Sequence, residues 1–134
     1  QNGWSVDSAQ NCANSLTTLA EMSARGQLTQ SHAMGVFEGP HAAEGRTFTI
    51  AAFLIGAGEL SYFSYANWAF GCWSMGGTAW WPEYDKPLGK PTSPPNTKVP
   101  GEKWKYTRSF SSGTTVTVDL LTRDVELKWG DERH

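Results

Sequence analysis

The chain has 134 residues, of which 39% are hydrophobic and 18% charged, so it has room for one domain of ordinary size or for part of a larger one. Its formal net charge of -2 excludes the strong positive field on which nucleic-acid and anionic-membrane binding depend. The apolar stretch 48–63 is interrupted by Gly56, Gly58 and Glu59, so it does not supply the ~20 apolar residues that span a bilayer.

The first residue and the cysteines indicate a processed, exported protein. The chain begins with Gln1 and its start does not resemble a signal peptide, so we expect a piece of a longer precursor. Cys12 and Cys72 fit no metal motif; they could form one disulfide, or they could be two separate thiols. The aromatic-rich, lysine-poor composition favours an extracellular or secretory location.

The first third of the chain predicts a helix, a strand and a loop. Apolar residues recur at helical spacing in residues 11–25, and Gly26 follows as a natural C-cap. Residues 28–33 alternate and begin straight after that glycine, which predicts a strand. Residues 34–45 contain several glycines and a proline, which predicts a loop.

The next segments complete an α/β order. Residues 47–58 are mostly apolar, and their length favours a buried helix, while a β-branched start and two glycines leave a strand possible. Residues 60–66 are aromatic and compact, which predicts a strand. Helix, strand, helix, strand is the order of α/β folds with parallel strands, and two such units are too few to close a barrel.

Residues 68–91 predict a long aromatic loop, because four of the seven tryptophans stand there among glycines and prolines. Aromatic rings beside carboxylates are what a sugar site needs, since a ring covers the apolar face of a pyranose while Asp and Glu accept its hydroxyls. The same rings could instead form a small core under the loop. The sequence leaves both interpretations open.

The last third of the chain predicts a second kind of structure. Residues 86–102 carry five prolines, which predicts a stiff connector that is neither helix nor central strand. Val116, Val118 and Leu120 alternate with polar residues, as in half-buried antiparallel strands. Three such segments, separated by hairpin turns, predict a β-meander: residues 104–110, 114–121 and 125–129.

The succession of these segments resembles a known family. GQLTQSHAMG, FTIAAFLIGAGELSYFSYA, WWPEYDKPLGKP and YTRSFSSGTTVTVDLLTRDVELKW are similar to the C-terminal part of the hypothetical glycosyl hydrolases of the family numbered fifteen. The resemblance runs over residues 16–129, and PEYDKPLGKP is its most specific part. The terminal Arg-x-Phe-x-x-Gly-x-x-Val pattern recurs more widely at the ends of barrel glycosidases.

This resemblance implies the C-terminal part of a (β/α)8 barrel followed by a small antiparallel β-meander. It would supply the last two barrel strands in residues 1–85, a connector in 86–102 and the β-structure in 103–134. Earlier strands would be missing, and glycosidases commonly take their two carboxylates from different strand ends about 5 to 9 Å apart. We therefore expect other polypeptide chains to complete the fold.

In such a barrel the substrate lies at the carboxyl ends of the strands. The resemblance thus suggests catalytic roles for Glu38 as general acid and His32 as a residue that orients a carboxylate or binds a hydroxyl. It suggests sugar contacts for these residues: His41, Tyr65, Asn67, Trp68, Trp80, Trp81, Glu83 and Asp85.

Each of these residues also has a structural interpretation. His32 beside a strand could be a hydrogen-bonded structural residue, Glu38 a solvated loop carboxylate, and Glu83 and Asp85 acceptors within a turn. No nucleophile elbow, phosphate loop, dinucleotide motif or zinc motif occurs in the sequence, so we expect neither a cofactor nor a metal. Two hypotheses result: a glycoside-hydrolase-like chain lining a sugar site, or a non-catalytic glycan-binding or structural subunit of an extracellular assembly.

Overall fold

A computed structural model describes residues 4–35, 40–67 and 81–130. The elements follow one another in this order: α1 (Val6–Ala24), β1 (Thr29–Gly35), α2 (Ala42–Gly56), β2 (Ser61–Asn67), η1 (Pro82–Asp85), β3 (Thr97–Lys98), β4 (Lys105–Ser109), β5 (Thr115–Asp119) and β6 (Val125–Lys128). Strands β1 and β2 form a parallel pair, and β3 to β6 form a four-stranded antiparallel sheet in sequence order.

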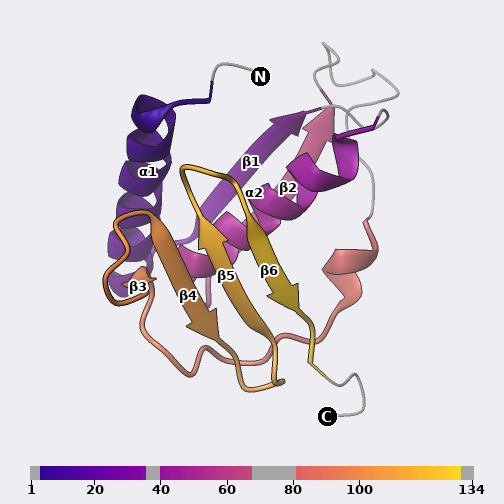
Figure 1. Cartoon of the computed structure of the whole chain (residues 1–134). Helices are drawn as coiled ribbons and strands as arrows, with labels where there is room; N and C mark the ends of the chain where they lie inside the picture. Colours follow the sequence, from indigo (N-terminus) through magenta and orange to yellow (C-terminus); the bar gives the residue numbers. More distant parts are fainter. Residues whose placement is uncertain (1–3, 36–39, 68–80, 131–134) are drawn as a thin grey trace.

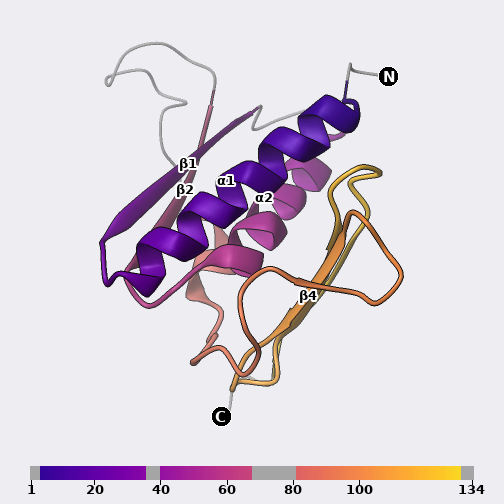
Figure 2. The same cartoon turned by 90° about the vertical axis from the view of Figure 1, so that its left-hand side faces the viewer.

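These elements stack in three layers (Figures 1 and 2). The parallel pair forms one outer layer, α1 and α2 form the middle layer, and the antiparallel sheet forms the other outer layer. Helix α2 contacts both sheets, because it packs on β1 and β2 on one side and on β4, β5 and β6 on the other. A helix that is apolar on nearly all sides suits this central place.

Helix α1 ends where the sequence predicts and begins earlier. Gly26 has a φ of 75° just after the C-cap, a left-handed conformation that glycine adopts without strain. At the other end, Ser5 and Ser8 form a reciprocal capping box, which satisfies free backbone N–H groups and starts the helix at Val6 rather than at residue 11.

Helix α2 confirms the helical interpretation of residues 47–58, but the predicted loop 34–45 is wrong at both ends. Met34 and Gly35 belong to β1, and the helix begins at Ala42. Gly45, which indicated a turn in the sequence, lies inside the helix. A Cβ there would be 3.7 Å from the hydroxyl of Tyr65, an ordinary contact distance, so the packing leaves room for a side chain at this position.

The two predicted strands are present and parallel. Their register places Thr29 opposite Ser61 and Gly35 opposite Asn67, one residue later at the start than the sequence predicts. Strand, helix and parallel strand form one β/α unit, the unit from which barrels and open α/β sheets are built. Within the part of the chain that the structure describes, β1 and β2 pair only with each other.

The antiparallel meander is confirmed. Val116, Val118 and Leu120 are each 0% exposed and belong to the same hydrophobic cluster as Leu54 and Ile55 of α2. The proline-rich segment adds only the two-residue edge strand β3, as expected for residues unable to enter a central strand. Residues 82–85 form a short 3-10 helix where the sequence predicts loop.

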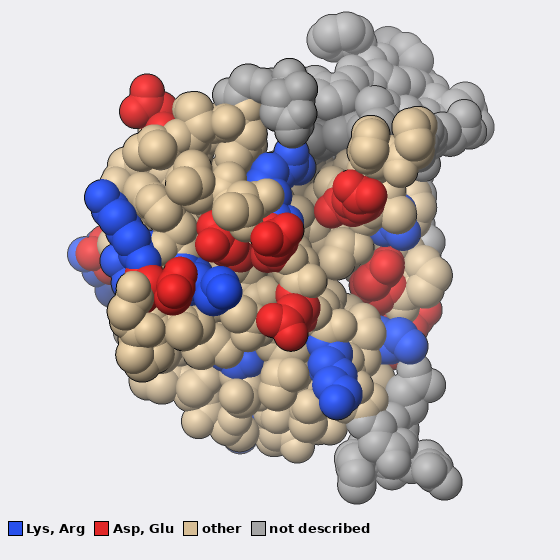
Figure 3. Space-filling model, in the orientation of Figure 1, with Lys and Arg blue, Asp and Glu red and all other residues tan. Residues whose placement is uncertain are grey.

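The surface bears on possible partners. On the face shown in Figure 3, basic and acidic side chains lie interspersed instead of forming separate patches. Over the described residues, no helix combines the length and the apolarity that crossing a membrane requires.

Candidate functional site

The parallel pair has one covered face and one open face. Thr29 and Phe63 point toward the helices, since Phe63 packs on Phe53 of α2 at 5.1 Å between ring centroids. Because side chains alternate along a strand, His32 and Ser64 point the other way. They lie opposite each other in the register, and His32 Nδ1 is 2.9 Å from Ser64 Oγ.

The open face changes character along the strands. Leu28 and Leu60, just before the two strands, are 59% and 40% exposed, and Tyr62 is 52% exposed. At the middle of the strands the exposed side chain is His32, bonded to Ser64. The open face is therefore apolar near the amino ends of the strands and carries hydrogen-bonding groups further along.

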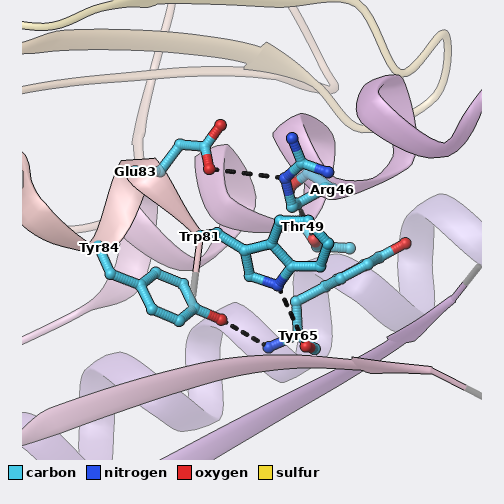
Figure 4. Close-up of polar contacts among 6 residues, drawn as sticks. All are labelled: Arg46, Thr49, Tyr65, Trp81, Glu83 and Tyr84. Carbon is cyan, nitrogen blue, oxygen red and sulfur yellow. Dashed lines mark hydrogen bonds and ion pairs between the residues drawn. The ribbon is translucent and has the colours of Figure 1, made fainter. Parts of the chain in front are cut away.

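A cluster around Trp81 covers the edge of β2 (Figure 4). The guanidinium of Arg46 lies over the Trp81 ring, 4.2 Å from its centroid, and its Nε is 3.5 Å from Glu83 Oε1. Both side chains of this ion pair are largely buried, with 15% and 21% of their surface exposed. The ring and the carboxylate together hold Arg46 at the start of α2.

Tyr65 joins this cluster through its backbone (Figure 4). Its N–H donates to the hydroxyl of Tyr84 at 2.9 Å, and its carbonyl accepts from Trp81 Nε1 at 3.4 Å. Its ring meets that of Trp81 edge to face, with centroids 6.1 Å apart. Trp81 and Tyr84 therefore satisfy both backbone groups that Tyr65 presents on the side away from β1.

Burial also acts on the phenol of Tyr65. Only 3% of this residue is exposed, and burial raises the pKa of its hydroxyl, while the positive charges of Arg46 and Arg123 act in the opposite direction. The hydroxyl therefore keeps its proton at neutral pH and can donate a hydrogen bond.

Comparison with known families decides where the chain belongs. A model of hypothetical glycosyl hydrolase family 15 matches residues 2–114. The chain belongs to this family. A comparison with curated proteins finds no match. The resemblance inferred from the residues is thus confirmed, and the match covers the β/α unit, the Trp81 cluster and the proline-rich segment.

Membership of hypothetical glycosyl hydrolase family 15 connects the chain with carbohydrates, and the structure shows where the predicted site residues lie. His32 is on the open face, and Tyr65, Trp81 and Glu83 meet in the cluster of Figure 4. Asp85 ends the 3-10 helix beside this cluster. Asn67 ends β2, but its side chain is not described. Three predicted residues lie outside the described residues: Glu38, Trp68 and Trp80.

His41 is not part of the cluster of Figure 4. It stands at the N-cap of α2, exposed to solvent, with Nδ1 3.4 Å from Glu44 Oε2. It makes no side-chain bond to the helix backbone. The sequence gives no local signal for the role of Arg46, one turn further on, because its partner Glu83 is far away in the chain.

The described residues contain no group of three His, Cys, Asp or Glu side chains arranged to hold a metal ion. Among the described residues Cys12 has no disulfide partner; its half-buried thiol packs against the hydrophobic core, and burial raises its pKa. Cys72 lies outside the described residues, so its pairing with Cys12 stays a prediction.

Proposed function

We propose that this chain is carbohydrate-active and contributes part of a sugar-binding, glycoside-hydrolase-like face at the carboxyl ends of β1 and β2. The observation that carries the proposal is the hydrogen-bonded pair His32 and Ser64, which stands on the open face of a parallel β-pair in a glycosyl hydrolase family. In folds built from β/α units, substrates bind at the carboxyl ends of the strands.

The chemistry of the open face suits a saccharide. An imidazole and a hydroxyl donate and accept hydrogen bonds, as neighbouring sugar hydroxyls do. The ring of Tyr62 offers an exposed apolar surface on the same face, on which the C–H face of a pyranose can stack. We propose Glu38 as the general acid, with Asn67, Trp68 and Trp80 as further contacts on this face.

Inside the Trp81 cluster the roles are more restricted. Glu83 pairs with Arg46, whose guanidinium also covers one face of Trp81. We propose that Trp81 and Glu83 mainly position the carboxyl end of β2, and that Asp85 reads hydroxyls beside them.

A second candidate is a non-catalytic glycan-binding or structural subunit of an extracellular assembly. The observation in its favour is the engagement of Glu83 with Arg46, because a catalytic carboxylate needs access to the glycosidic oxygen. Under either function we propose that strands from other polypeptide continue the sheet from β1 and cover Leu28, Leu60 and Tyr62, as in a partial barrel.

Turnover and binding on one polysaccharide panel distinguish the two functions. For a hydrolase-like chain with its partner strands, we expect reducing sugar to be released, and His32→Ala and Glu38→Gln to lower that release at least tenfold. For a binder, affinity falls in His32→Ala and no sugar is released. Glu126→Gln, on the outer face of β6, is the matched control and leaves both readouts unchanged. If no polysaccharide binds and none is cleaved, the proposal is wrong.

The association of the chain is tested separately. We expect sedimentation velocity to show complexes or self-association that weaken when Leu28, Leu60 and Tyr62 are replaced by serine. A chain that stays monomeric, folds cooperatively and does not respond to these substitutions contradicts the proposed partial barrel.

A further inference from the structure

We propose a second saccharide-binding site, on the far side of α2 from the open face, in a cavity between the first turn of α2 and the turn that joins β5 to β6. The cavity has a volume of about 500 Å³. Charged, polar and aromatic side chains line it: His41, Glu44, Phe48, Thr122, Arg123 and Asp124. Its volume is in the range of small-molecule sites. The class of ligand rests on the proposed function, while the site itself is distinct from the face with His32.

Arg123 is held rigidly at the wall of this cavity. Its backbone has a φ of 69°, unusual for a residue with a side chain, and its N–H bonds to Asp119 O at 2.8 Å. The carboxylate of Asp119 accepts the N–H groups of Leu121 and Thr122 at 2.8 and 2.9 Å. This network fixes the turn, so the direction of the Arg123 side chain is set before any ligand arrives.

The guanidinium of Arg123 packs against two aromatic rings that touch each other. It is 4.9 Å from the centroid of Trp4 and 5.0 Å from that of Phe48, and these rings meet edge to face. No ion pair or hydrogen bond of this side chain occurs within the described residues, and its Nε is a buried donor without an acceptor. A fixed guanidinium whose donors have no protein acceptor is suited to oxygen atoms of a ligand.

The rest of the lining supplies acceptors. Glu44 has 77% of its side chain exposed, Asp124 is exposed on the same turn as Arg123, and the hydroxyl of Thr122 both donates and accepts. Two carboxylates beside one guanidinium repel an anionic ligand. A donor next to acceptors fits the adjacent hydroxyls of a neutral sugar, each of which both donates and accepts. The ligand class is therefore a neutral saccharide.

The test is a nuclear magnetic resonance titration of backbone amides with cellohexaose, maltohexaose and xylohexaose, and with an oligogalacturonate as the acidic arm. We expect at least one neutral probe to shift the amides of residues 122–124. The double variant E44Q/D124N keeps the shape of the cavity and should weaken this binding about tenfold or more, since hydrogen bonds to charged groups are stronger than those to neutral amides. Glu126→Gln is the control and should change nothing.

The His32→Ala variant separates this site from the open face. We expect it to leave the shifts at residues 122–124 intact, even if it abolishes binding or turnover at the open face. Arg123→Lys, which keeps the charge and loses the planar fork, should weaken binding at the turn only. The inference is overturned if no neutral probe moves these amides, if E44Q/D124N binds as well as the original chain, or if only the oligogalacturonate binds there.

Discussion

Arg108 of β4 donates a hydrogen bond of 2.9 Å from Nη1 to the carbonyl oxygen of Leu54, near the end of α2. The same nitrogen donates to Ala57 O at 2.5 Å. Arg108 is 3% exposed, and burial lowers the pKa of its guanidinium. The carbonyl dipoles at a helix C-terminus favour a positive charge, so this contact joins the antiparallel sheet to the helix layer.

Replacing Arg108 should destabilise the whole chain. Arg108→Met removes the donor and leaves two buried carbonyls unsatisfied, so we expect the free energy of unfolding to fall by about 3 kcal/mol. Arg108→Lys keeps the charge but reaches fewer carbonyls, and we expect about half that loss. Urea denaturation measures both. Lys128→Met, on the exposed side of β6, should change stability by less than about 0.5 kcal/mol.

Asn96 links the two helices by a similar contact. Its side-chain Nδ2 donates to Leu16 O of α1 at 3.0 Å, and its backbone N–H donates to Ile55 O of α2 at 2.9 Å, with φ at 56°. Asn96→Gly keeps the backbone conformation and loses the side-chain bond, so we expect a loss of about 1 kcal/mol. Asn96→Ala adds the left-handed backbone penalty of about 1 kcal/mol. Equal effects of the two variants in thermal unfolding would show that the backbone is not strained there.

Ionisation of Tyr106 makes the free energy of unfolding depend on pH in the alkaline range. Burial raises the pKa of its hydroxyl, and the nearby Cys12 thiolate adds to this effect. Because the folded chain holds a proton that the unfolded chain releases, this contribution is complete below the unfolded pKa of about 10 and is lost as pH rises through the folded value.

The Tyr106→Phe variant tests that dependence. It keeps the ring and removes the ionisable group, so we expect its free energy of unfolding to fall less steeply above about pH 10 than that of the original chain. Urea denaturation at several pH values is the measurement, and Tyr62→Phe, whose ring is exposed, is the control. Parallel curves for the original chain and Tyr106→Phe would contradict the prediction.

The Arg46 cluster can be divided by double-mutant cycles. The ring centroid of Trp81 lies 4.2 Å from the guanidinium carbon of Arg46. In a cycle of Arg46→Met and Trp81→Leu, we therefore expect a coupling energy of about 1 kcal/mol. The Nε of Arg46 and the Oε1 of Glu83 are 3.5 Å apart and make no hydrogen bond with each other, so Arg46→Met with Glu83→Gln should give a smaller coupling. The reverse order would show that Glu83, not Trp81, holds Arg46 in place.

The sequence predicts the elements whose signals are local. Val116, Val118 and Leu120 alternate with polar residues, and they form the inner face of β5 and its following turn. Gly26 marks the end of α1 because a left-handed residue is needed there. The parallel pairing of β1 and β2 follows from the order of strand, helix and strand, which needs no knowledge of distant contacts.

The features that the sequence does not predict depend on distant partners. Gly45 resembles a turn residue, yet it lies in the first turn of α2, and the packing there leaves room for a Cβ. Arg108 belongs to the Arg-x-Phe-x-x-Gly-x-x-Val pattern, but its carbonyl acceptors lie on α2. The sequence does not predict the roles of Arg123 and Arg46 for the same reason: each guanidinium stacks on an aromatic ring that lies far away in the chain. Composition therefore predicts which residue types form the candidate site, but not which of these residues contact each other.

The central position of α2 matters for how the family is delimited. The family match stops at residue 114, one residue before β5 begins, whereas the cluster that buries α2 continues through Leu120. A protein trimmed at that boundary would lose β5 and β6 and expose the apolar back of the helix. Fragments of relatives that end with the matched segment would therefore be insoluble. Their lack of activity would then reflect the missing strands and not the chemistry of the family.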